Sequence, residues 1–352
     1  MNPTMKRDNL FLIPLIIIAF FVIVVIFREL RELLVPFAIA VLFSILFNPL
    51  VSFLRQKKVP IVFSLIVVLC LIGGTIFILG TLIYSSAMPL VQELPNYQNK
   101  FDQILNNAAG ALGDILGAVG FKSGPIDTKT LFGVTTVTAE ALSSTLATFL
   151  DFLGKVGLFM IFMLFMLAGT GNLNAKIQKA YSSEMAKLIR TALQNIGKQV
   201  RRYLVIRILL SGLAGLLTML ITWMLGVNFA LFWGFMAFQL SLIPTVGAFL
   251  AISLPFIFSL LQFDELTRPL LVLVFLSTVF MINGNVVQPK LMAETLNLSP
   301  LLIIVALIFW GLMWGPWGMI LAIPLTTAIK IIFENIEPLK PISIIMSAGS
   351  DQ

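Results

Sequence analysis

Long apolar runs without a charged residue make up most of this chain. They cover residues 10–27, 33–54, 61–84, 156–175, 208–226, 229–262, 269–289 and 300–329. A run of about 18 or more apolar residues is long enough to cross the hydrocarbon core of a membrane as a helix. The pattern therefore predicts an all-α protein, a polytopic transmembrane helical bundle of about eight spans.

Two of the runs are too long for a single crossing. Residues 229–262 and 300–333 contain 34 residues each, and Lys330 is the one charged residue among them. As a straight helix, a run of that length would extend about 51 Å, against a hydrocarbon core of about 30 Å. We expect each run to break, fold back or tilt strongly. Pro244 and Gly247 are the helix breakers in the first run, and the second contains Gly311-Leu-Met-Trp-Gly-Pro-Trp-Gly318.

The two runs share a short internal sequence repeat, called the sequence echo below. At an offset of 71 positions, the octet that begins at Gly247 matches the octet that begins at Gly318 in five of eight positions. Chance similarity is the alternative in such apolar sequence. Each octet nevertheless follows a proline closely, and paired hydrophobic segments interrupted by Gly or Pro are typical of a transporter's binding site. If the first run enters from outside and the second from inside, they form an inverted pair.

A helix break inside a membrane frees backbone amides and carbonyls, which cost several kcal/mol each when nothing pairs with them. These groups need a solute, a water or a side chain. Uncharged polar residues near the breaks extend the polar lining, and hydrogen bonding between helices is the alternative role for them. The predicted substrate-binding residues are Gln239, Ser241, Pro244, Thr245, Gly247, Asn283, Asn285, Gln288, Gly315, Pro316 and Gly318.

The positions of Lys and Arg predict the orientation, because cations near membrane segments are retained on the cytoplasmic side. Residues 176–207 hold eight cations against one Glu, whereas residues 85–150 have a net charge of −2. We expect a cytoplasmic N-terminus and an extracytoplasmic helical insertion. The predicted parts are three transmembrane helices (1–84), the insertion (85–150), a fourth helix (151–175), a basic amphipathic cytoplasmic helix (176–207), a transport core with broken helices (208–334) and a tail (335–352).

The basic segment repeats apolar residues at helical spacing from Ala175 to Arg207, which predicts one amphipathic helix. Such a helix either holds anionic lipid headgroups or packs on the bundle or on a neighbouring subunit. Shorter signals make three more predictions. Asn48-Pro49 predicts a further helix break. Trp310, Trp314 and Trp317 predict an interfacial belt, and Cys70 is expected to be a small buried apolar side chain.

The composition excludes several kinds of chemistry. Apolar residues make up 59% of the chain and charged residues 11%, and histidine, a P-loop and zinc-ligand spacing are absent. We therefore expect no enzyme activity, no cofactor, no metal site and no nucleic-acid partner. Cation exchange normally uses an acid inside the membrane. Only Asp151 approaches such a position, and with Lys155 it is interpreted as a pair at the start of the fourth helix.

Seven motifs, taken in order, resemble the bacterial autoinducer-2 exporter family of inner-membrane permeases. They read LVPFAIA from Leu34, NPLV from Asn48, QVRRYL from Gln199, GVNFALFWG from Gly226, IPTVG from Ile243, NVVQPK from Asn285 and GPWG from Gly315. The resemblance covers about residues 30 to 330. It implies a permease of about eight helices that assembles from identical subunits, with a pentamer as one form, and exports autoinducer-2 or similar small polar molecules.

The same resemblance places the family's broken-helix motifs on Pro244, Gly247, Asn285, Gln288, Pro289, Gly315, Pro316 and Gly318. Thr245 and Val246 depart from the family pattern, since many members have an aromatic or bulkier residue there.

The favoured function is a permease for small uncharged polar solutes, autoinducer-2 above all, because the predicted lining carries no fixed charge. Its expected partners are the lipid bilayer, the solute and further copies of the chain. A sodium or lithium/proton antiporter is the alternative, and it needs Asp151 or Glu294 in the pathway. A membrane scaffold or assembly factor, acting through the insertion and the basic helix, is the alternative from another class.

Overall fold

The computed structural model describes residues 21–78, 139–292 and 297–348, together with scattered positions between 14 and 19 and between 80 and 93. Every regular element within these residues is helical, which confirms the all-α prediction. The predicted insertion lies outside the described residues from 94 to 138.

Several helices are long and apolar enough to cross a membrane. They are α2 (Arg31–Gln56), the helix Ile61–Ser86, α6 (Ser183–Met224), the helical stretch Thr267–Leu291 and α11 (Pro300–Glu334). Shorter apolar helices cover Gly154–Gly169 inside α5 (Ala139–Ala180), α7 (Ala230–Ser241) and α8 (Val246–Gln262). Their outward side chains are strongly apolar: Phe165, Met224 and Leu312 are 75%, 76% and 79% exposed. Contiguous apolar surface of this kind is what a lipid bilayer covers, so the chain is a multi-pass membrane protein.

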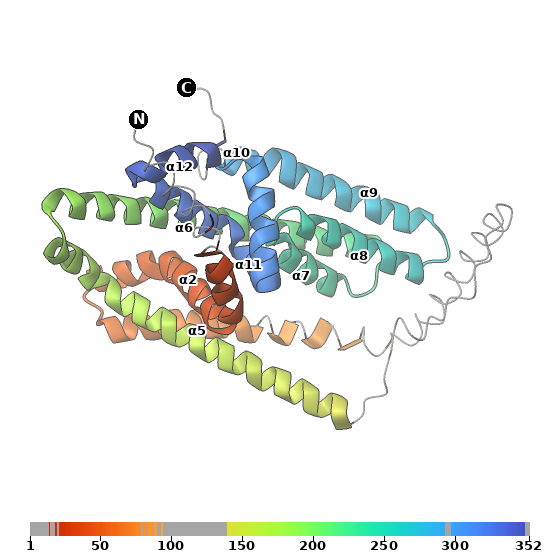
Figure 1. The fold of residues 1–352 in the computed structure, drawn as a ribbon. Coiled ribbons are helices and arrows are strands. Elements are labelled where there is room, and N and C mark those ends of the chain that lie inside the picture. Colours follow the sequence, from red (N-terminus) through yellow and green to blue (C-terminus); the bar gives the residue numbers. More distant parts are fainter. Residues whose placement is uncertain are drawn as a thin grey trace, which may run out of the picture. The chain divides into compact units, whose positions relative to one another are not determined.

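The chain forms two compact units. The first unit comprises Met1–Leu71, Phe152–Arg207 and Lys290–Gln352, and the second comprises Ile72–Asp151 and Ile208–Pro289. Figure 1 colours the chain by sequence, so the second unit's helices α7 and α8 are teal and the first unit's α11 is blue.

The core of the first unit is formed by α2, α6 and α11. Ala38, Leu42 and Val200 pack with Trp310 and other buried residues of α11. Helix α2 also packs on α5 through perpendicular aromatic rings, with the Phe43 and Phe159 centroids 5.4 Å apart. Small residues at the α2 contact let the helices approach closely, as is typical of helix packing in membranes.

Pro49 does not interrupt α2, so the predicted break at Asn48-Pro49 is wrong. A proline inside a helix leaves the carbonyl four residues earlier without its amide donor. That carbonyl belongs to Ile45, and Nε of Arg201 donates a hydrogen bond to it over 3.1 Å. Arg201 of α6 therefore replaces the missing backbone donor, and the helix continues.

The Arg201 side chain donates in place of the backbone amide that Pro49 lacks, and this leads to a prediction about stability. Arg201→Ala should cost about 1.5 to 3 kcal/mol, because a carbonyl loses a charged hydrogen-bond donor. In a Pro49→Ala background the restored amide of residue 49 serves Ile45, so the same change should cost less than about 1 kcal/mol. Unfolding of the purified variants measures the difference. Lys198→Ala on the exposed side of α6 is the control, and equal costs in both backgrounds would contradict the interpretation.

In the second unit α7 packs on α6, and α8 packs on α7 and on α9 (Thr267–Ile282). Gly215 of α6 and Gly234 of α7 face each other, so a Cβ on Gly215 would lie 2.7 Å from the carbonyl oxygen of Gly234. At the far end of α8, Gln262 joins the turn between α6 and α7. Its Nε2 donates to the Gly226 carbonyl over 2.7 Å, and its Oε1 accepts from the Asn228 amide over 2.7 Å.

Three further expectations are corrected. The segment from Ala175 to Arg207 is not one helix, because α5 ends at Ala180 and α6 begins at Ser183 and continues to Met224. Since α5 already begins at Ala139, Asp151 lies inside a 42-residue helix rather than at the start of one. Cys70 is exposed on the helix Ile61–Ser86 and is not buried. In the first two cases the apolar pattern placed a helix correctly but not its ends, and for Cys70 it did not show which face of the helix is buried.

Candidate functional site

The first over-long run folds back between α7 and α8. Helix α7 ends at Ser241, and Thr245 then takes φ 60° and ψ −64°, a backbone conformation that L-residues rarely adopt. The amide of Val246 donates to the Pro244 carbonyl over 2.7 Å, which closes a tight turn. The two arms then pack side by side, with the ring centroids of Trp233 and Phe258 5.2 Å apart (Figure 1). The predicted break near Pro244 is confirmed.

Gly247 is buried where the two arms meet. A Cβ built on it would overlap the carbonyl oxygen of Leu240 and would lie 3.3 Å from the amide nitrogen of Ser241. Both are main-chain atoms, which cannot rotate away as a flexible side chain does. Only glycine therefore allows this approach of α8 to the end of α7.

The second over-long run also folds back, at Gly315. This residue has φ 63° and ψ −145°, and it divides α11 into two arms. Nε1 of Trp310 donates to Oγ1 of Thr326 over 3.4 Å. Residues sixteen apart in a straight helix are separated by about 24 Å, so this bond requires that the arms be folded together. The expected break in the second run is confirmed as well.

Gly318 repeats in the second hairpin what Gly247 does in the first. A Cβ on Gly318 would overlap the carbonyl oxygen of Trp310 and would lie 3.1 Å from Cβ of Trp314. The two glycines are the first residues of the matching octets. The sequence echo thus corresponds to one recurring contact, a glycine pressed against a main-chain carbonyl seven or eight residues earlier.

Two of the three tryptophans expected in an interfacial belt are core residues instead. Trp310 and Trp314 are each 7% exposed, whereas Trp317 is 53% exposed. The rings of Trp310 and Trp314 lie 4.9 Å apart, and Nε1 of Trp314 donates to the Phe27 carbonyl over 3.0 Å. They fill the hairpin of α11, so the belt prediction is wrong for this pair.

The irregularity expected around Asn283, Gly284 and Asn285 is a π-helical turn, η1 (Asn283–Val287), between α9 and α10 (Gln288–Met292). Single π-helical turns inside α-helices are frequent at functional sites. Nδ2 of Asn283 donates to the Leu210 carbonyl of α6 over 3.4 Å. A groove lined by Leu213, Leu217, Val279, Ile282 and Val287 opens beside the Asn283 side chain.

Among the described residues of the second unit, four side-chain polar atoms are buried without a hydrogen-bond partner. They are the hydroxyl oxygens of Ser211, Thr218 and Ser241 and the amide oxygen of Asn283. Ser211 is a residue that the sequence reasoning missed. A lone serine in an apolar helix gives no sequence signal, and only the structure shows that its hydroxyl is buried without a partner.

The predicted site residues are divided between the two units. Ser241, Pro244, Gly247 and Asn283 belong to the second unit and are at least half-buried. Gln239, Thr245 and Asn285 are exposed, and Gln288 is half-buried where α10 begins. Gly315, Pro316 and Gly318 belong to the first unit. A single site shared by the two breaks stays a prediction.

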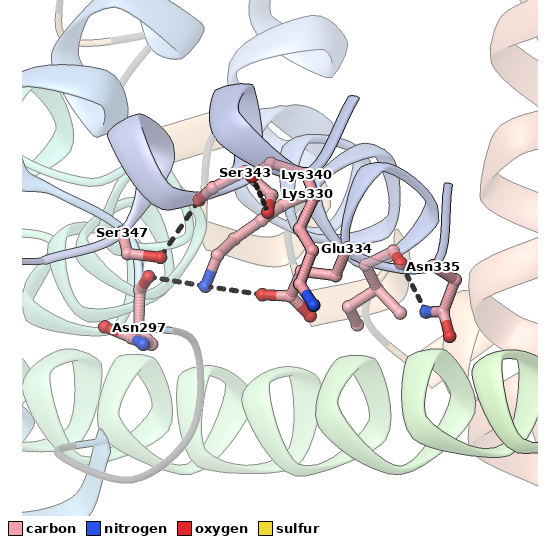
Figure 2. Close-up of polar contacts among 8 residues, drawn as sticks. Asn297, Lys330, Glu334, Asn335, Lys340, Ser343 and Ser347 are labelled. Carbon is pink, nitrogen blue, oxygen red and sulfur yellow. Dashed lines mark hydrogen bonds and ion pairs between the residues drawn. The ribbon is translucent and has the colours of Figure 1, made fainter. Parts of the chain in front are cut away.

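A polar clasp around Lys330 was also missed from the sequence. Lys330 is 3% exposed, and its Nζ donates to the Asn297 carbonyl over 2.8 Å and pairs with Glu334 at 3.2 Å. Figure 2 shows this ammonium between Asn297 and Glu334. The amide of Ser299 donates to the Met346 carbonyl over 3.0 Å, which fastens the end of α12 (Lys340–Met346) to the start of α11. The buried cation holds the ends of the hairpin together.

Comparisons with known proteins agree with this architecture. The profile of the AI-2E family transporters matches residues 15–337. The chain is 30% identical over 320 residues to the AI-2 transport protein TqsA of Escherichia coli (strain K12), a match that covers 91% of each chain. It is 27% identical over 326 residues to the putative transport protein YhhT of the same strain, covering 90% of this chain and 89% of YhhT. A putative transport protein of Borreliella burgdorferi is 27% identical over 320 residues, covering 89% of this chain and 84% of that protein.

Proposed function

Because this chain belongs to the AI-2E family of transporters, we propose that it exports small uncharged polar solutes, autoinducer-2 above all. The chain is a membrane permease, and its similarity to the AI-2 transport protein TqsA supports the choice of solute. Autoinducer-2 is a small hydroxylated molecule. A lining of main-chain groups, hydroxyls and amides without fixed charge suits such a molecule.

The observation that carries the proposal is the pair of glycine-locked hairpins. A helix that turns back inside a membrane leaves main-chain groups that lipid cannot satisfy. At the first turn, these groups lie next to the polar side chains of Ser241 and Thr245. Two such turns in one chain are typical of a transporter in which discontinuous helices bind the solute.

The proposed function also implies a membrane, an orientation and an assembly for the protein. We place the protein in the inner membrane of a bacterial cell, with its N-terminus in the cytoplasm, as the cations at 55–58 and 176–207 favour. Export of autoinducer-2 would then serve quorum sensing. We further propose that identical subunits assemble, with a pentamer as the form to test first.

Flux through the purified protein in liposomes tests the function. Vesicles loaded with autoinducer-2, sodium or lithium are compared with empty liposomes, with and without a pH gradient. We expect protein-dependent movement of autoinducer-2 without a requirement for sodium or lithium. Exchange of sodium or lithium for protons, with no autoinducer-2 flux, would favour the antiporter, and no flux of any of them would favour the scaffold.

A further inference from the structure

Many hydroxyl groups in the described helices donate their proton to a carbonyl of their own helix. A Ser or Thr inside a helix often donates to the carbonyl three or four residues earlier. The residues that do so here include Ser44, Ser64, Thr81, Ser85, Thr222, Ser253, Ser259, Thr278, Thr327 and Ser343. Ser211 and Ser241, which are 1% and 6% exposed, do not. Their hydroxyls have no hydrogen-bond partner.

The packing of the second unit brings these two hydroxyls to one level. Ala214 of α6, Ala237 of α7 and Phe280 of α9 belong to one buried cluster. Ser211 lies one turn before Ala214 on α6, and Ser241 lies one turn after Ala237 on α7. Because α6 and α7 are antiparallel, these two steps lead in the same direction, and the two serines lie at the same level.

Asn283 completes the group. It lies one turn after Phe280, and its bond to the Leu210 carbonyl fixes it beside Ser211. One amide proton is used in that bond, and the amide oxygen remains unpaired. Tyr203 and Thr218 also have buried unpaired oxygens, but Tyr203 is in the first unit and Thr218 lies two turns further along α6.

We propose that Ser211, Ser241 and Asn283 bind the hydroxyl groups of a neutral polyhydroxylated solute. This inference rests on the proposed function and names the atoms that recognise the cargo. Two hydroxyls that donate and accept, together with an amide oxygen that accepts, match a ligand whose own hydroxyls donate and accept. Each buried oxygen without a partner is unfavourable in the empty protein, and the bound solute relieves that cost.

The surroundings select against a cation. The sequence contains no Asp or Glu between Ile208 and Phe263 or between Thr267 and Pro289, which are the stretches that form this part of the unit. An ion at low dielectric without an opposite charge is strongly disfavoured. The groove that opens beside Asn283 is apolar apart from that residue, which suits the carbon skeleton of a small neutral molecule.

The test measures solute affinity in single serine variants of the full chain. Ser211→Ala and Ser241→Ala should each raise the half-saturation concentration for autoinducer-2 in proteoliposomes by roughly 3- to 10-fold, the loss of one hydrogen bond. The maximal rate should stay near that of the wild type. The rise in melting temperature that autoinducer-2 gives the wild type should shrink in parallel, while the ligand-free variants should melt no lower than the wild type.

Ser259→Ala is the matched control. Ser259 is a fully buried serine of the same unit, but its hydroxyl already donates to the Phe256 carbonyl over 2.7 Å, so its loss should leave the half-saturation concentration unchanged. If the wild type transports autoinducer-2 and both Ser211→Ala and Ser241→Ala keep the wild-type affinity, this inference is wrong and the proposed function stands. Stabilisation of the wild type by sodium chloride that both variants lose would overturn it in favour of a cation site. A wild type that neither moves nor binds autoinducer-2 would overturn the proposed function, and this is visible without any variant.

Discussion

Gly247→Ala should abolish transport while the chain still inserts into the membrane. The new methyl group would overlap the Leu240 carbonyl oxygen, so α8 must move away from the end of α7. Forced overpacking against a backbone that cannot rotate away costs about 3 kcal/mol or more. Insertion should persist because it depends on the hydrophobicity of the segment, which alanine preserves. Uptake into inverted vesicles, together with the amount of protein in the membrane fraction, measures both expectations.

Gly212→Ala is the control for this prediction. Gly212 lies on α6 in the same unit, and nothing comes within 4 Å of a Cβ placed there. It should transport as the wild type does. If Gly247→Ala also moved solute at the wild-type rate, the close contact between α7 and α8 would be irrelevant to transport.

Gly318→Ala should have an effect of the same size in the other hairpin. Its methyl group would overlap the Trp310 carbonyl oxygen and press on Trp314, so the arms of α11 must separate. That separation should also weaken the bond between Trp310 and Thr326 and expose the buried tryptophans. We expect transport to be lost, and tryptophan fluorescence to shift to longer wavelength as the indoles meet a more polar environment.

Gly197→Ala serves as the comparison in the first unit, because a Cβ there meets nothing within 4 Å. It should leave transport and fluorescence unchanged. Loss of transport in Gly247→Ala but not in Gly318→Ala would mean that the two matching octets have different roles, and that the sequence echo is accidental.

The sequence predicted the breaks because chain length and bilayer thickness alone require them. A run of 34 apolar residues does not fit one crossing, and Pro244, Gly315 and Pro316 mark where the backbone can turn. The irregularity at Asn283 to Asn285 was predicted for the same reason, since polar residues around a glycine are costly in a regular membrane helix.

Side-chain environments could not be predicted in this way. Hydropathy treats Trp310 as it treats Trp317, yet only the first is buried, because its neighbours include Thr326, sixteen positions away, and residues of other helices such as Val200. Ser211 becomes a candidate binding residue only together with Ser241 and Asn283, which lie on other helices. Asp151 was misplaced because polar residues before it suggested a loop, whereas α5 continues through them.

Fold-back of the second long run is the claim on which the account depends most, and a cysteine pair tests it directly. With Cys70 replaced by serine, cysteines are placed at Gly311 and Met319, where a Cβ on Gly311 comes within 3.0 Å of the Met319 side chain. Residues eight apart in a straight helix are separated by about 12 Å, beyond the reach of a disulfide. Cysteines at Leu213 and Ile221 in the continuous helix α6 provide the matched negative pair.

The measurement is the number of thiols that react with a polymer-linked maleimide after oxidation in native membranes. With α11 folded back, the cysteine pair at 311 and 319 should lose both reactive thiols, and the pair at 213 and 221 should keep them. Equal reactivity of the two pairs would show that α11 is straight and that the second hairpin does not exist.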